Sequence, residues 1–384
     1  MHKGCQFFIP ELEHIARCKV DGVVGFVPGA EQTGKGGFHL PMVKYEFSGN
    51  CQNLLTFSLV WHRIWLIEPT TLKYLRILRT KVGLFRIWVN TDETIKTPLS
   101  YGEQINRLII EHALTIDDMQ AATDILNRVN YYRLSAYGIG LKRFDDAEKY
   151  IPGITIQTLY DLYCFDSQLR NILIPVIEAI EIDLRTKIAY HLAMTYGADG
   201  YYDATNFQPK TDRAGNSIHA MTIEKFGKEV IHQKNLPCVI HHMQVYGGRF
   251  PVWVAVELFT FGMLSSLYSI MKPDDQKAVA KQYGTDPYHL VSWFLSLVEL
   301  RNLCAHYNRV YNMPLKQTAK LYREHRRYQC NRLFPILLVI KRMTSKTKHW
   351  NVFLSQLLEL IKQYPVANLS FMGFPDNWER LLRK

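Results

Sequence analysis

Apolar residues recur at helical spacing along most of this chain from Ser100 onward. Ser100 and Glu103 form a capping-box pair at the start of the first such segment. Pro175 marks a point where a long helix could bend. Helices are predicted over residues 117–129, 156–194, 219–233, 253–271, 274–283, 286–311, 316–343 and 350–363. Residues 197–216, rich in Gly, Asp, Asn and Tyr, are predicted to form a loop. We therefore expect an all-α main body.

The first 95 residues have a different pattern. Val23–Val27 and Met42–Phe47 are β-like and are joined by a glycine-rich loop, which predicts a β-hairpin. Leu54–Val89 is rich in Trp, Ile, Leu, Arg and Lys but lacks helix caps, so the pattern assigns it to neither helix nor strand. We divide the chain accordingly into an N-terminal extension of uncertain status, 1–95, and a helical domain, 96–384.

Composition narrows the range of functions only slightly. The chain has 46 Lys and Arg against 35 Asp and Glu, a net charge of +11, which favours a polyanionic partner without requiring one. Its seven cysteines are scattered without zinc spacing, and we expect them to be reduced and mostly buried. The sequence shows neither a signal peptide nor an apolar run long enough to cross a membrane. These features predict a cytoplasmic protein without membrane association.

No cofactor is predicted. Gly29–Gly36 approaches the phosphate-binding loop pattern, but Gly36 stands where that loop needs Ser or Thr to hold Mg²⁺. The neighbouring His241 and His242 lack further ligands at metal-binding spacing. We therefore expect neither a nucleotide site nor a metal site.

The candidate chemistry lies in Leu300–Asn312, LRNLCAHYNRVYN, where four residues separate Arg301 from His306. Arginine can hold phosphate charge and imidazole can transfer a proton near neutral pH, so the pair suits phosphodiester cleavage. One straight helix over Val291–Tyr311 would place the two side chains about 140° apart. A second copy of the chain across a two-fold axis would ease that separation. Capping and salt-bridge clusters have the same spacing, so it leaves a structural role open.

Two further features bear on nucleic-acid binding. Residues 316–348 carry ten Lys and Arg against one acid, Glu324, and could hold an RNA backbone or simply form a solvated face. The candidate RNA-binding residues are Lys316, Lys320, Arg323, Arg326 and Arg327. Tyr131, Tyr132 and Tyr137 could stack on bases, although burial between helices is the more frequent role of such aromatics.

Arg301–His306 resembles the RN-x-x-AH form of the R-x4–6-H motif of HEPN-superfamily ribonucleases. More specifically, the chain is similar to the Abi-like proteins of bacterial abortive infection, the AbiD/AbiF group. The resemblance covers about 98–384. Other blocks of that family match in order: Asn130–Tyr137, with Ala136 where glycine is usual; Phe165-Asp166 with Leu169-Arg170; Glu178 with Glu181 and Arg185; and Pro251, Trp253, Glu257 and Phe261-Gly262. Glu181 and Arg185 stand at the i,i+4 spacing of a helical ion pair, which favours a structural role for them.

The resemblance implies a HEPN-like helical bundle and a metal-independent endoribonuclease that acts in antiphage defence and cleaves RNA through its 2′-OH. Arg301 and His306 would be the catalytic pair, supported by Asn302, Asn308 and Arg309. It also implies a homodimer with a composite active site, and a regulatory RNA or antitoxin partner is left open. The alternatives are a non-catalytic RNA-binding module and a helical interaction protein in which the motif is structural.

Overall fold

The computed structural model describes residues 72–80, 83–90, 96–344 and 347–383 of the 384-residue chain. The chain divides into two units, Met1–Pro98 and Leu99–Lys384. No helix in the described ranges has an apolar stretch of the length needed to cross a membrane.

The first unit contains a β-hairpin. Strand β1 (Leu72–Thr80) pairs antiparallel with β2 (Gly83–Asn90). This hairpin falls largely within Leu54–Val89, the segment that the sequence pattern left unassigned. The hairpin predicted for Val23–Val27 and Met42–Phe47 lies outside the described residues.

The second unit begins with three short helices, α3 (Tyr101–Ile110), α4 (Met119–Arg128) and α5 (Tyr131–Ser135), each with a side-chain cap. The predicted capping box of Ser100 and Glu103 is confirmed: the amide of each residue donates to the side chain of the other. These helices pack on the first turns of α6 around their own small core.

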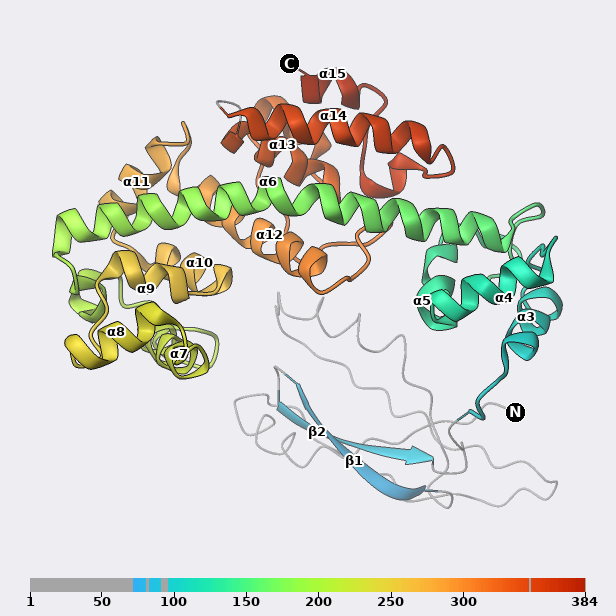
Figure 1. Cartoon of the computed structure of the whole chain (residues 1–384), viewed down its shortest axis with the longest axis horizontal. Coiled ribbons are helices and arrows are strands. Elements are labelled where there is room, and N and C mark those ends of the chain that lie inside the picture. Colours follow the sequence, from blue (N-terminus) through green and yellow to red (C-terminus); the bar gives the residue numbers. More distant parts are fainter. Residues whose placement is uncertain (1–71, 81–82, 91–95, 345–346, 384) are drawn as a thin grey trace, which may run out of the picture. The chain divides into compact units, whose positions relative to one another are not determined.

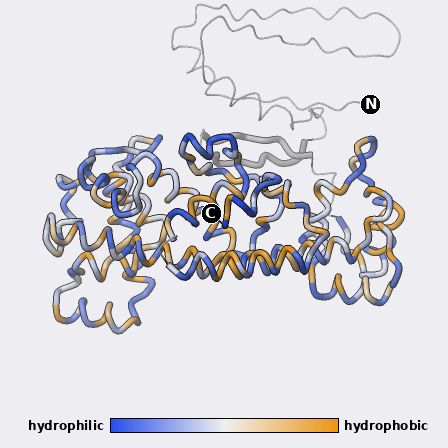
Figure 2. The backbone as a smooth tube through the Cα atoms, turned by 90° about the horizontal axis from the view of Figure 1, so that it is seen from above, coloured by the Kyte–Doolittle hydropathy of each residue, from blue (hydrophilic) through white to orange (hydrophobic). Residues whose placement is uncertain are grey.

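The central element is α6 (Ile156–Tyr196), a helix of 41 residues that runs continuously through Pro175. At 1.5 Å per residue it is about 60 Å long. It passes the full length of the second unit, and most of the other helices of this unit lie along it (Figure 1). Hydrophobic and hydrophilic positions alternate along the helices instead of forming one apolar run (Figure 2). Helices α3, α4 and α5 bury apolar residues in the small core, and the later helices bury theirs in the main core along α6.

The remaining helices are α7 (Ile218–His232), α8 (Pro237–Val245), α9 (Val252–Leu258), α10 (Phe261–Ile270), α11 (Pro273–Lys281), α12 (Pro287–Ala305), α13 (Leu333–Thr344), α14 (Lys348–Gln363) and α15 (Trp378–Arg383). Apart from loops and isolated bridges, the described part of this unit is helical, which confirms the all-α prediction.

Four segments predicted from the sequence differ from the structure. The helix predicted over 253–271 is two helices, because the Thr260 side chain accepts from the Met263 amide and starts α10 afresh. The predicted loop over 197–216 contains two short 3₁₀ turns. The helices predicted over 286–311 and 316–343 are also wrong in extent, for reasons that lie in the candidate site.

Candidate functional site

Helix α12 ends between the two candidate catalytic residues. Arg301 lies within the helix, just before its last turn, whereas His306 is the C-cap and has left the helix. A Schellman turn closes the end: the Asn308 amide donates to Leu303 O at 2.9 Å and the Tyr307 amide to Cys304 O at 3.2 Å. The continuous helix predicted over Val291–Tyr311 is therefore wrong, and the angle calculated from it does not describe this pair.

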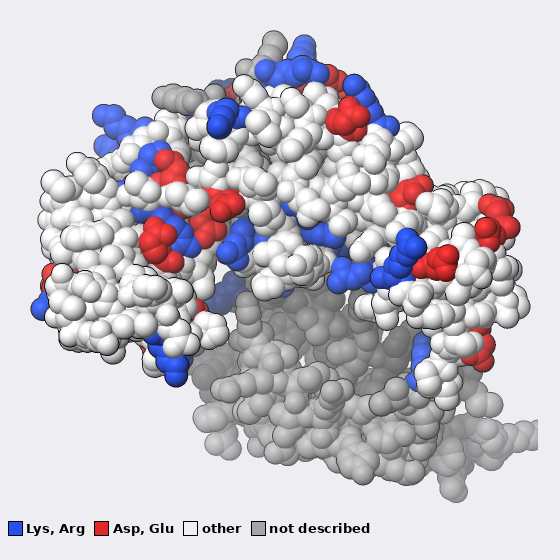
Figure 3. Space-filling view, viewed as in Figure 1, with Lys and Arg blue, Asp and Glu red and all other residues white. Residues whose placement is uncertain are grey.

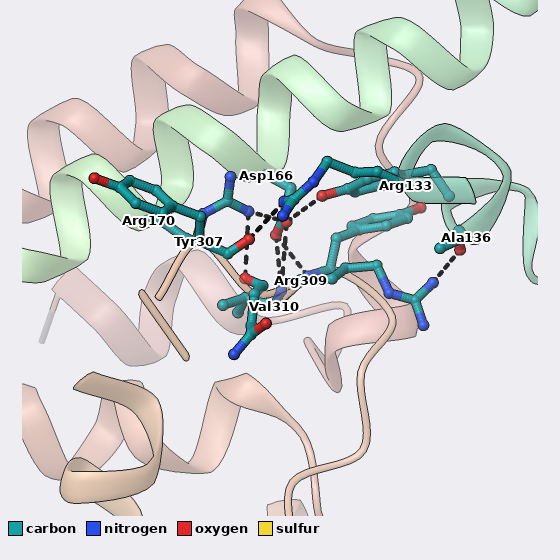
Figure 4. A network of polar contacts seen from close by, with 10 residues as sticks. Arg133, Ala136, Asp166, Arg170, Tyr307, Arg309 and Val310 are labelled. Atoms are coloured by element: carbon teal, nitrogen blue, oxygen red, sulfur yellow. Dashed lines mark hydrogen bonds and ion pairs between the residues drawn. The ribbon is translucent and has the colours of Figure 1, made fainter. Parts of the chain in front are cut away.

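The chain that follows the turn is bound by Asp166, whose carboxylate on α6 is fully buried. It accepts hydrogen bonds from the amides of Val310 (3.1 Å) and Tyr311 (2.7 Å) and from the Tyr137 hydroxyl (2.7 Å). It also pairs with Arg170, one helical turn along (Figure 4). Burial raises the pKa of Asp166, and these four donors act in the opposite direction. One buried acid thus fixes where residues 308–311 run.

The Asn130–Gly140 segment holds the same loop from the other side. Three side chains bind backbone carbonyls across this contact: Arg133 to Tyr307 (2.7 Å), Arg309 to Ala136, and Asn312 to Ile139 (2.8 Å). Arg309, predicted to support catalysis, is half-buried in this contact, and its burial lowers the pKa of its guanidinium. Asn308, its predicted companion, is exposed, and its carbonyl accepts from Arg170 at 3.4 Å.

A second buried acid orients Arg301. The Glu181 carboxylate lies 3.5 Å from the Arg301 Nε and also pairs with Arg185, as the i,i+4 spacing predicted. Glu181 and Arg185 are each less than a tenth exposed, whereas the Arg301 side chain is 39% exposed. The exposed Asn302 accepts from the Arg301 guanidinium at 3.4 Å. Arg301 is therefore tethered at Nε while part of its guanidinium faces solvent.

The His306 side chain is exposed and makes no hydrogen bond or ion pair with any residue that the structure describes. Between it and Arg301, burial raises the pKa of the Cys304 thiol to about 12. Near the turn, His306 thus presents a titratable imidazole to solvent and Arg301 a partly exposed cation. That pair could move a proton and hold an anion.

The basic segment after the turn is not the predicted helix. Residues 315–322 run along α12, whose side chains bind their backbone: Glu299 accepts from the Lys316 and Gln317 amides (2.8 and 2.6 Å), and Ser292 accepts from the Lys320 amide (2.9 Å). A 3₁₀ helix, Arg323–Tyr328, follows. These bonds to α12 replace helical ones, so α13 begins only at Leu333.

All five predicted RNA-binding cations, Lys316, Lys320, Arg323, Arg326 and Arg327, have exposed side chains. The Arg327 guanidinium lies over the Tyr328 ring. Figure 3 shows basic and acidic side chains interspersed on the face that it presents, not one continuous positive surface. Exposure is what an RNA-binding role needs, but a solvated face has it as well.

The three tyrosines that the sequence offered for base stacking differ in burial. Tyr137 is buried and Tyr131 half-buried, whereas Tyr132 is 84% exposed. Among the described residues, no group of three or more His, Cys, Asp or Glu side chains is placed to hold a metal. Of the described cysteines only Cys304 is buried, so the expectation of mostly buried thiols is wrong for these.

One comparison with known families covers the turn and the two buried acids, but not the basic segment after residue 312. Residues 124–312 match the family model of the Abi-like proteins. The chain is similar to these proteins over this stretch, which we call the Abi-like region. It begins within α4, ends at Asn312 and contains the Asp166 and Glu181 networks together with Arg301 and His306. No curated protein and no solved structure shows a significant match to the chain.

Sequence reasoning missed the role of Asp166. The signal was present as an acid and an arginine at i and i+4 on a face of α6 that is otherwise apolar. That spacing predicts the pair with Arg170. It does not reveal that the same carboxylate binds two amides 144 and 145 residues further along the chain.

Proposed function

We propose that this protein is a cytoplasmic, metal-independent endoribonuclease of the HEPN type that serves bacterial abortive infection, with Arg301 and His306 as its catalytic pair. The Abi-like region supports the setting in antiphage defence. The observation that carries the chemistry is a contrast in burial: two buried carboxylates, Asp166 and Glu181, fix the segment around an exposed imidazole and a half-exposed guanidinium. A buried charge is costly unless all its hydrogen-bonding partners are in place, so the networks of Asp166 and Glu181 favour a single arrangement of the turn.

In the proposed reaction the 2′-oxygen of RNA attacks the adjacent phosphorus and the bond to the 5′-oxygen breaks. His306 takes the proton from the 2′-OH or delivers one to the leaving oxygen. Arg301 stabilises the charge that gathers on the phosphorane oxygens. The products are a 2′,3′-cyclic phosphate and a 5′-hydroxyl, and DNA is not cut because it lacks the attacking group.

A homodimer is part of the proposal. A second copy of the turn across a two-fold axis would supply a second imidazole, so that one histidine acts as base and the other as acid. The exposed cations from Lys316 to Arg327 would bind the RNA backbone. A regulatory RNA or antitoxin would then act by covering the shared cleft.

The ion pair between Arg301 and buried Glu181 is compatible with a different function, because an arginine with a purely structural role would form the same pair. On that alternative the chain is a non-catalytic RNA-binding module or a helical interaction protein, and His306 has no chemical task.

The two are separated by incubating wild type, Arg301→Ala and His306→Ala with RNA in EDTA, after circular dichroism has shown that each is folded. Arg213→Ala and His232→Ala are matched controls, because both residues are exposed and lie elsewhere in the same unit. We expect cleavage by wild type and by both controls, and none by the two site variants. Full cleavage by folded His306→Ala would rule out the mechanism.

A further inference from the structure

Tyr307, the residue after the candidate catalytic histidine, has a strained backbone. Its φ of 56° lies in the left-handed region, at the position of a Schellman turn where glycine is the usual residue. A bulky side chain is unfavourable there, because its Cβ approaches the carbonyl, whereas glycine adopts the same φ freely. The turn itself therefore gives no reason for a tyrosine.

The Tyr307 ring does not offset this strain through packing. It is 71% exposed and makes no hydrogen bond or ring contact with the described residues. Figure 4 shows the ring directed away from the polar network that its carbonyl joins. Tyr137 and Tyr311, in contrast, are buried, and their hydroxyls bond to the Asp166 carboxylate and the Asn368 amide.

The surroundings fix the backbone from which this exposed ring projects. Arg133 donates to the Tyr307 carbonyl at 2.7 Å, and the turn hydrogen bonds fix the amides on either side. The residue before Arg133 is Tyr132, which is 84% exposed. Two exposed tyrosines and an exposed arginine thus lie on the two segments that meet beside His306.

We propose that the Tyr307 ring stacks on an unpaired RNA base next to the cleaved phosphate, and that Tyr132 offers a second stacking surface. Proteins that hold single-stranded nucleic acid combine exposed aromatic rings with cations in this way. Bases within a duplex are covered by their neighbours and cannot stack on such a ring. This inference rests on the proposed function and assigns to that site a preference for single-stranded over duplex RNA.

The test measures binding separately from cleavage. A fluorescent, 2′-O-methylated single strand of mixed sequence cannot react, and it is titrated alone and annealed to its complement. Tyr307→Gly removes the ring and suits the left-handed backbone, so its melting temperature should not fall below that of wild type. Tyr307→Trp keeps a stacking ring, and Tyr190→Ala removes an equally exposed tyrosine from α6.

We expect Tyr307→Gly to bind the single strand about 5- to 150-fold more weakly, the range for losing one base stack. Tyr307→Trp and Tyr190→Ala should bind it as wild type does, and duplex binding should not change. Equal single-strand binding by Tyr307→Gly, an equal loss on duplex, or no binding by wild type would overturn the inference. Weaker single-strand binding in a protein that cuts no RNA would support stacking and reject the nuclease, so the two failures are distinguishable.

Discussion

Replacing Asp166 by alanine should destabilise the protein more than almost any other single change in α6. The fully buried carboxylate serves four donors: the Val310 and Tyr311 amides, the Tyr137 hydroxyl and the Arg170 guanidinium. The alanine variant leaves all four without this acceptor, and the Arg170 side chain, only 5% exposed, keeps a charge that has lost its partner. Breaking a buried pair by removing one member costs about 3–5 kcal/mol. That is a large share of the roughly 5–15 kcal/mol by which a domain is stable.

The assay is urea unfolding followed by circular dichroism for wild type, Asp166→Ala and Asp166→Asn. The asparagine variant keeps an oxygen for the two amides but loses the charge opposite Arg170, so its loss should be smaller than that of alanine. Glu178→Ala is the matched control, since Glu178 is an exposed acid on the same helix, and it should change the free energy of unfolding by less than about 0.5 kcal/mol. An alanine variant as stable as this control would refute the role assigned to Asp166.

Three smaller tests address other parts of the second unit. Ser100→Ala removes the α3 cap and should lower the free energy of unfolding by about 1 kcal/mol in urea titrations. Gly138→Ala should lower the melting temperature, because the added Cβ would overlap the Tyr150 ring and force a shift costing about 1–3 kcal/mol. At pH 8 the native protein should show alkylation of exposed Cys238 but not of Cys304 by peptide mapping. Because the folded-state pKa of Cys304 is raised to about 12, its contribution to stability should be intact below the pKa of an unfolded thiol and fall as pH rises from there towards 12.

The features that sequence reasoning predicted correctly are local ones. Ser100 and Glu103 stand three residues apart and Glu181 and Arg185 four apart, and helix geometry alone brings such pairs together. The all-α body was also predicted correctly, because the spacing of apolar residues along a helix is a local property of the sequence. None of these predictions needed knowledge of a distant residue.

What the sequence could not predict depends on contacts between distant segments. The end of α12 at Ala305 carries no glycine stop signal, because Tyr307 occupies the left-handed position. Asp166 fixes the chain beyond that turn from α6. Residues 315–322 are not helical because the Glu299 carboxylate accepts hydrogen bonds from the Lys316 and Gln317 amides, although their sequence has no marked helix breaker after Pro314.

The catalytic claim is tested most directly by the RNA ends that the protein produces. Wild type and His232→Ala, incubated with RNA in EDTA, should yield fragments that end in a 2′,3′-cyclic phosphate, while folded His306→Ala yields none. Fragments with the same ends from His306→Ala, in the amount that wild type produces, would contradict the assignment of His306 as the proton-transferring group.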